Sequence, residues 1–161
     1  MNKKLLLLPL IFSMSLIVVA QESGPSGFEH WSADSLKQLG QTLKTEASAN
    51  PSHIGTRHLQ DFPNDSFLMS VRQADGVVEW HENQADVFVV ESGSATLIVG
   101  GTMVGEQTTE PHEKRNGTIQ GGTRVRLSPG DIVRIPPKTP HQLLLDGAKD
   151  FTYFVVKVKG Y

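Results

Sequence analysis

The chain has 161 residues, of which 38% are hydrophobic and 20% are charged, and its formal net charge is −2. This length and composition predict one globular domain and exclude a largely disordered chain. The charge argues against a nucleic-acid partner, because basic residues are not in excess and do not interleave with aromatic ones. The sequence contains no cysteine, which excludes disulfides and lipid attachment through an N-terminal cysteine.

Residues 1–20 have the pattern of a signal peptide. A short positive start at residues 2–4 precedes an apolar run at residues 5–19, and residues 18–20 place Val-Val-Ala where a signal peptidase reads. The apolar run is shorter than the ~20 residues that cross a bilayer. We therefore expect cleavage after Ala20, export to the periplasm or out of the cell, and no stable membrane anchoring. An uncleaved N-terminal anchor is the alternative.

Residues 21–31 are a linker by composition, and residues 32–65 are expected to hold one helix and a connecting segment. An amphipathic helix is predicted over residues 32–47, with Ser32 as its cap and Asn50-Pro51 beyond its end. The apolar residues on one face, at spacings of three and four, are Leu36, Leu39, Leu43 and Ala47. This helix is expected to pack against the outside of a barrel.

Residues 66–161 are predicted to form an all-β barrel domain. Eight short runs rich in Val, Ile, Phe and Thr alternate with turn residues, without a helical period between them, which favours an antiparallel sandwich or barrel. The runs are 66–73, 77–81, 87–91, 95–99, 123–127, 132–135, 141–145 and 151–159. A homodimer is expected through edge strands such as 66–73 or 151–159. The polar segment 104–122 is either a functional lid or a plain surface excursion.

Two stretches of this domain carry potential metal ligands. In a strand, residues two apart share a face, so Glu79 and His81 point the same way. The loop at residues 82–85 lets the chain reverse, and Asp86 then opens the next strand towards the same interior. In the second stretch a Gly-Asp turn, an apolar strand and a proline-stiffened turn deliver His141 at the start of a strand.

These stretches resemble the two motifs of the cupin superfamily, whose fold is an antiparallel β-barrel (a double-stranded β-helix, or jelly roll). The first motif is a glycine, five residues, His-x-His, three or four residues, Glu, six residues and a glycine. Counting back from Gly93 places Asp86 at the glutamate, His81 at the second histidine and Glu79 at the first. In the second motif Gly130, Pro136 and His141 match the first glycine, the proline and the histidine.

The chain departs from the cupin pattern at several positions. Glu79 replaces a histidine, Asp86 replaces a glutamate, Lys138 replaces the second motif's glycine, Leu145 replaces its Asn, and the first glycine is displaced to Gly76. The resemblance implies a divalent metal held by His81, His141, Asp86 and Glu79. Such a mixed set suits Mn, Fe or Zn. Glu79 could instead form a salt bridge with Arg72 or Arg134.

The remaining candidate residues are assigned to the surface or the barrel interior. The histidines without a partner at ligand spacing are His30, His53, His58 and His112, which we place on the surface, as we do Glu82. The residues expected to line the barrel interior are Phe88, Val90, Val133, Ile135, Leu143 and Leu145.

Three functions follow as hypotheses. The first is a metal-dependent enzyme that acts on a small molecule by dioxygenase, isomerase or lyase chemistry, with Glu79 as general base. The second is a non-catalytic module that holds a small ligand in the barrel. The third is an envelope protein in which a metal only stabilises the barrel.

Overall fold

The computed structural model describes residues 24–161, so the predicted signal peptide at residues 1–20 lies outside the described residues. Within the described part, the chain forms one helix followed by thirteen strands. The helix is α1 (Ala33–Ala49), and the strands are β1 (Ile54–Asp61), β2 (Asp65–Arg72), β3 (Glu79–His81), β4 (Gln84–Gly93), β5 (Ala95–Val99), β6 (Thr102–Val104), β7 (Gln107–Glu110), β8 (Glu113–Arg115), β9 (Thr118–Gln120), β10 (Thr123–Leu127), β11 (Ile132–Ile135), β12 (His141–Leu144) and β13 (Phe151–Lys159). No helix in residues 24–161 has the length and apolar character needed to cross a membrane.

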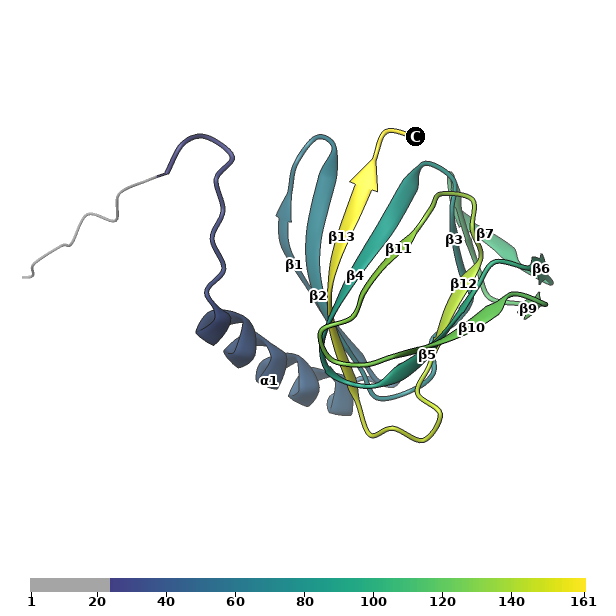
Figure 1. Ribbon diagram of the computed structural model, residues 1–161, viewed down its shortest axis with the longest axis horizontal. Helices are drawn as coiled ribbons and strands as arrows, with labels where there is room; N and C mark the ends of the chain where they lie inside the picture. The colour runs from purple at the N-terminus through teal and green to yellow at the C-terminus, as the bar shows by residue number, and fades with distance from the viewer. Residues whose placement is uncertain (1–23) are drawn as a thin grey trace, which may run out of the picture.

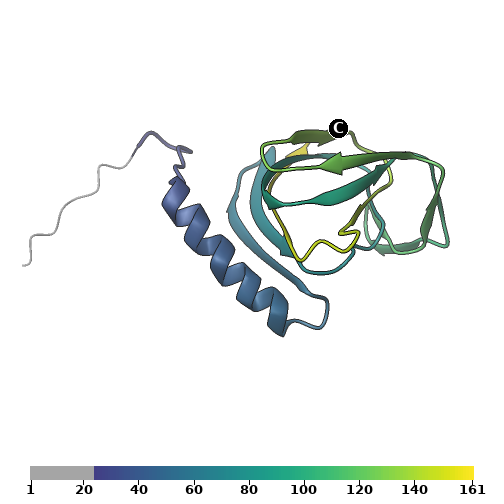
Figure 2. The ribbon, with the colours of Figure 1, turned by 60° about the horizontal axis from the view of Figure 1, so that its bottom comes forward.

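The helix forms where the apolar spacing predicts it and covers the outside of the barrel. Its N-cap is Ser32, whose hydroxyl accepts a hydrogen bond from the backbone N–H of Ser35 at 3.2 Å. The helix lies along β1 and β2, on the side away from the barrel interior (Figure 2). The residues buried between helix and sheet are Leu43, Ala47, Met69 and Val71. The predicted helix, its cap and its packing are therefore confirmed.

The strands form two facing antiparallel sheets (Figure 1). One sheet has the order β1-β2-β13-β4-β11, and the other has the order β10-β5-β12-β3-β8-β7. Strand β1 was not predicted from the sequence, because its side chains are mostly exposed and polar and only Gly55 is buried. It pairs with β2, and β13 lies between β2 and β4. The prediction that residues 66–73 or 151–159 form edge strands is therefore wrong, since both are interior.

Residues 102–120 form a nested hairpin rather than an irregular excursion. Strand β6 pairs with β9, and between them β7 pairs with β8. The β6–β9 pair projects from the end of the molecule opposite the helix (Figure 1). Strand β8 also pairs with β3, so the inner part of this hairpin extends the six-stranded sheet. The polar segment thus contributes directly to the wall of the barrel.

The core lies between the two sheets. Its buried residues are Leu68, Phe88, Val90, Ala95, Leu97, Leu127, Ile135, Leu143, Leu145, Phe151, Tyr153 and Val155. Five of the six residues predicted to line the interior are in this core, and Val133 is half-buried against it. On β2 both faces are covered, because alternate residues face the helix and the barrel interior.

Candidate metal centre

Strand register brings the four predicted ligands to one end of the barrel. In the six-stranded sheet, Glu79 lies opposite His141 on β12 and opposite Arg115 on β8. The next row pairs His81 with Glu113. In the facing sheet, Asp86 on β4 lies opposite Lys157 on β13. The site therefore forms where these pairs of residues from the two sheets face one another across the barrel interior.

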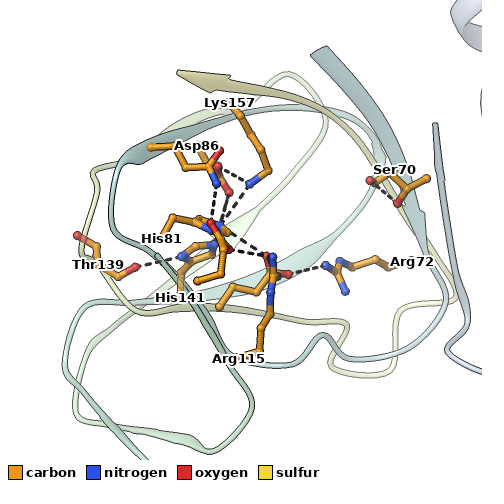
Figure 3. A network of polar contacts seen from close by, with 12 residues as sticks. Ser70, Arg72, His81, Asp86, Arg115, Thr139, His141 and Lys157 are labelled. Carbon is orange, nitrogen blue, oxygen red and sulfur yellow. Dashed lines mark hydrogen bonds and ion pairs between the residues drawn. The ribbon is translucent and has the colours of Figure 1, made fainter. Parts of the chain in front are cut away.

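Both histidines present the same ring nitrogen to the interior. The Nδ1–H of His81 donates to Oε2 of Glu113 at 2.6 Å, and that of His141 donates to the backbone carbonyl of Thr139 at 3.1 Å. A carboxylate and a carbonyl only accept hydrogen bonds, so each Nδ1 carries a proton, and in the neutral imidazole each Nε2 then presents its lone pair to the interior. The side chain of Gln84 fixes Glu113 in turn, since its Nε2 donates to Oε1 at 2.7 Å. Figure 3 shows both rings and their contacts.

Three of the predicted residues form a group that could hold a metal ion. One ligand atom from each of Glu79, His81 and His141 lies within 4.8 Å of the other two. Asp86 adjoins this group, with Oδ2 at 3.3 Å from Nε2 of His81 and 3.6 Å from Nε2 of His141. The shorter Asp side chain therefore reaches both imidazoles from the opposite sheet.

Two arginines hold the carboxylate of Glu79. Nη2 of Arg72 lies 3.1 Å from Oε1, and Nη1 of Arg115 contacts Oε2. The salt bridge to Arg72 was one of the two predicted alternatives, whereas Arg134 contacts Tyr161 instead. Burial alone would raise the pKa of Glu79, but the positive charges of Arg115 and Arg72 outweigh it and lower that pKa. Glu79 is therefore an anion anchored on both oxygens.

Asp86 is the most buried carboxylate of the site, with 2% of its surface exposed. Lys157 Nζ donates to Oδ1 of Asp86 at 2.9 Å and lies 3.3 Å from Nε2 of His81. Burial alone would raise the pKa of Asp86, but the charge of Lys157 outweighs it and holds that pKa below its ordinary range. Asp86 is thus ionised and paired with an ammonium inside the barrel.

A cavity of about 210 Å³ opens beside three of the four residues, Glu79, Asp86 and His141. Its polar wall contains Arg72, Glu79, Asp86, Arg115, His141 and Lys157, and its apolar wall contains Leu68, Phe88, Leu143, Tyr153 and Val155. The guanidinium of Arg72 is fixed there, because Nε donates to the hydroxyl of Tyr153 at 2.8 Å. Burial is the main cause of a raised pKa at Tyr153, which therefore stays a neutral phenol.

Sequence reasoning missed three charged residues of this site. Lys157 continues the inward alternation of Tyr153 and Val155 on β13, so strand periodicity could have found it. Glu113 and Arg115 lie in a polar segment without an apolar pattern, and only the pairing of β8 with β3 brings them to the site.

The residues assigned to the surface lie away from the cluster. His30, His53, His58 and His112 are exposed, and Glu82 is partly exposed. The Nδ1–H of His112 donates to Oε2 of Glu82 at 2.6 Å. This exposed pair has the same distance from Nδ1 to Oε2 as His81 and Glu113, but it faces solvent. The surface prediction for these histidines is confirmed.

No protein-family model matches the sequence, and no curated protein matches it significantly. The cupin domain of Schizosaccharomyces pombe Cnp3 superposes with a TM-score of 0.50 and 10% identity, over 66% of this chain and 64% of that one. The chain thus spans less than two thirds of that structure. A cupin 2 conserved barrel domain protein from Salinispora arenicola matches with a TM-score of 0.47 and 19% identity, over 70% and 83% of the two chains. Streptomyces PAC13 with uridine matches with a TM-score of 0.49 and 10% identity, over 70% and 74%.

Similarity at these identities concerns the fold rather than the activity. The predicted architecture, a barrel of two antiparallel sheets preceded by one helix, is the one that the structure shows. The fold of the Cnp3 cupin domain superposes on 66% of this chain. The chain therefore has the cupin fold.

Proposed function

We propose that this chain binds one divalent metal ion in the barrel, through His81, His141 and the carboxylates of Glu79 and Asp86. The observation that carries the proposal is Nε2 of His141, which is buried and has no hydrogen-bond partner. An unpaired buried acceptor costs free energy unless something binds it. A metal ion would bind this nitrogen and its neighbours at once.

The surrounding atoms support a cation at this point. With both histidines protonated on Nδ1, the two Nε2 atoms and the carboxylate oxygens of Asp86 and Glu79 are all acceptors, and they face one another. Facing acceptors repel unless a cation lies between them. Two imidazoles with carboxylates form a donor set suited to Mn, Fe or Zn. The residues therefore fit a divalent ion.

The second part of the proposal is a small-molecule ligand in the adjoining cavity. The cavity has one apolar and one charged wall, as expected for a site that orients a small polar molecule. A bound ion would supply Lewis acidity to an oxygen of that molecule. The role of Glu79 as general base stays a prediction. Its two arginines favour a structural or ligand role, because they lower its affinity for a proton.

Metal analysis and unfolding test the metal proposal. We expect about one divalent ion per chain in protein purified without chelator, and a lower melting temperature after chelation. An ion at 100 times its dissociation constant stabilises the fold by about 2.7 kcal/mol. The control is His112→Ala, which removes an exposed histidine whose ring pairs with Glu82 rather than with the cluster. Equal metal affinity in the wild type and in His141→Ala would contradict the proposal.

A metal-free binding pocket is the second candidate, and charge balance is the observation that favours it. The cations Arg72, Arg115 and Lys157 contact the anions Glu79, Asp86 and Glu113, so the cluster is neutral without an ion. A small ligand that binds the His81→Ala, His141→Ala double variant as tightly as the wild type would support this candidate. Loss of ligand binding together with the metal would support the first.

A further inference from the structure

We propose that Lys157 is a built-in competitor of the metal, whose ammonium takes the ion's place in the metal-free protein and leaves when the ion binds. This inference rests on the proposed metal site. It goes beyond that site because it assigns a role to a residue that is not itself a metal ligand. Lys157 would then set the affinity of the site for metal.

The position of the ammonium carries the inference. Nζ of Lys157 lies 2.9 Å from Oδ1 of Asp86 and 3.3 Å from Nε2 of His81, so it bridges two of the four proposed ligands. Figure 3 shows Lys157 reaching from above toward Asp86 and His81. A metal bound to the same nitrogen at ~2.1 Å would lie close to the ammonium. Two cations at that separation repel strongly in a buried site.

The charges of the cluster point the same way. Lys157 is the one of the three cations that contacts two proposed ligands, Asp86 and His81, whereas Arg72 and Arg115 contact only Glu79 among the four. Arg72 is also bonded to Tyr153, and Arg115 also contacts Glu113, so both arginines are less able to leave Glu79. A divalent ion adds two positive charges to a balanced cluster. Departure of Lys157 is the simplest way to reduce that excess.

The structure also offers the displaced ammonium a second position. Lys157 borders a neighbouring cavity of about 210 Å³, which Gln84, Thr109, Glu110, Glu113 and Arg115 also line. The carboxylates of Glu110 and Glu113 can receive the ammonium there. About 21% of the Lys157 side chain is exposed, and its four-carbon stem allows it to rotate outward. Lys157 can therefore exchange between two polar sites without a change in the backbone.

The test is a titration of Mn²⁺ and Zn²⁺ into metal-free protein by calorimetry. Lys157→Met and Lys157→Gln should bind the ion roughly tenfold more tightly than the wild type, the factor expected when one partly buried ion pair no longer has to be broken. Lys157→Gln can still donate to Asp86, which protects the fold if the Met variant is unstable. The control is Lys159→Met on the same strand, whose ammonium contacts Asp61 at 3.8 Å, away from the site.

A second readout follows the lysine itself. Reductive methylation analysed by mass spectrometry should modify Lys157 faster in the metal-loaded protein than in the metal-free protein, while Lys159 should not change. Unchanged reactivity of Lys157, or equal or weaker metal binding by both Lys157 variants, overturns the inference and leaves the metal site standing. Absence of binding in every protein overturns the inference and the proposed function together. Binding by the variants alone supports the inference in its strongest form.

Discussion

Glu113 and His81 form a short hydrogen bond within the site. The carboxylate accepts from Nδ1 at 2.6 Å, and only 3% of the His81 side chain is exposed. Such a carboxylate fixes the ring, selects the tautomer with a free Nε2 and makes that nitrogen a stronger ligand. The orientation of His81 thus depends on a residue that lies 32 positions away in the sequence.

Replacing Glu113 should therefore weaken metal binding without removing a ligand. We expect Glu113→Ala to lower metal affinity by about 10- to 100-fold, because His81 loses its fixed tautomer and orientation. Calorimetric titration with Zn²⁺ measures this change. Glu82→Ala is a matched control, since Glu82 accepts from Nδ1 of the exposed His112 at the same 2.6 Å. Equal losses in the two variants would contradict the specific role of Glu113.

Single residues of the site could be predicted to different degrees. Motif spacing and strand facing were enough to select His81, His141, Glu79 and Asp86, which the structure brings together. Their ionic partners were harder to predict, because a side chain's partner depends on which strands become neighbours. Arg72 was within reach as a salt-bridge candidate, whereas Arg115 depends on the unpredicted pairing of β8 with β3.

At the level of elements, two positions next to strands have a left-handed backbone conformation. Gly93 ends β4 with a φ of 78°, and a Cβ there would overlap the carbonyl oxygen of Asp150. Lys138, in the turn before β12, also has a positive φ of 58°, although it occupies the place of a glycine in the cupin motif. Its N–H donates to the carbonyl of His81 at 2.7 Å, which ties the turn to β3.

Gly93→Ala should destabilise the fold for two reasons, the left-handed backbone and the overlap with Asp150. We expect a loss of about 3 kcal/mol or more in the free energy of unfolding. Gly130→Ala isolates the backbone cost, because Gly130 has a φ of 90° and nothing within 4 Å of the added Cβ. It should lose only about 1–2 kcal/mol. Urea unfolding measures both, and equal losses would show that the close approach is unimportant.

Lys138→Gly should raise the free energy of unfolding by about 0.5 kcal/mol. Relief of a left-handed side-chain conformation contributes about 1–2 kcal/mol, and the greater freedom of glycine in the unfolded chain offsets part of it. Lys149→Gly serves as the comparison, because Lys149 is an exposed loop residue without a positive φ. It should lose stability in the same urea experiment. A loss in Lys138→Gly would mean that its side chain makes a stabilising contact.

Element prediction succeeded where apolar residues repeat and failed where they do not. The helix and the strands of the core have a clear period, since one face of each is buried. Strand β1 and the hairpin strands β7 and β8 lack such an apolar face. They are held in place by backbone pairing with neighbouring strands. That pairing leaves little trace in a single sequence.

At the level of the whole molecule, the edges of the five-stranded sheet are β1 and β11. These strands, rather than the interior β2 and β13, have unpaired backbone groups that a second copy could bind. We still expect a homodimer, and light scattering coupled to size exclusion should give twice the mass of the mature chain. Strand pairing through β1 or β11 would be detected as slowed amide exchange on that strand in concentrated samples. A monomer mass at all concentrations would contradict the prediction.

Export remains a prediction of the sequence, since residues 1–20 lie outside the described residues. Intact mass spectrometry of protein from the native cell should give a chain that begins at Gln21. The matched variant is Ala20→Arg, which blocks the cleavage position and should keep the full-length mass in the membrane fraction. Full-length wild-type protein in the soluble cytoplasmic fraction would contradict export.

The nested hairpin at residues 102–120 separates the residues that tune the site from those that form the core. The helix and the core strands bury the apolar side chains of the barrel, while strand β8 of the hairpin supplies Glu113 and Arg115 to the site. Substitutions in β8 should therefore change the proposed metal centre more than they change the packing of the core. Exchanging the sequence of β7 and β8 should therefore change the surroundings of His81 and Glu79 without redesign of the core.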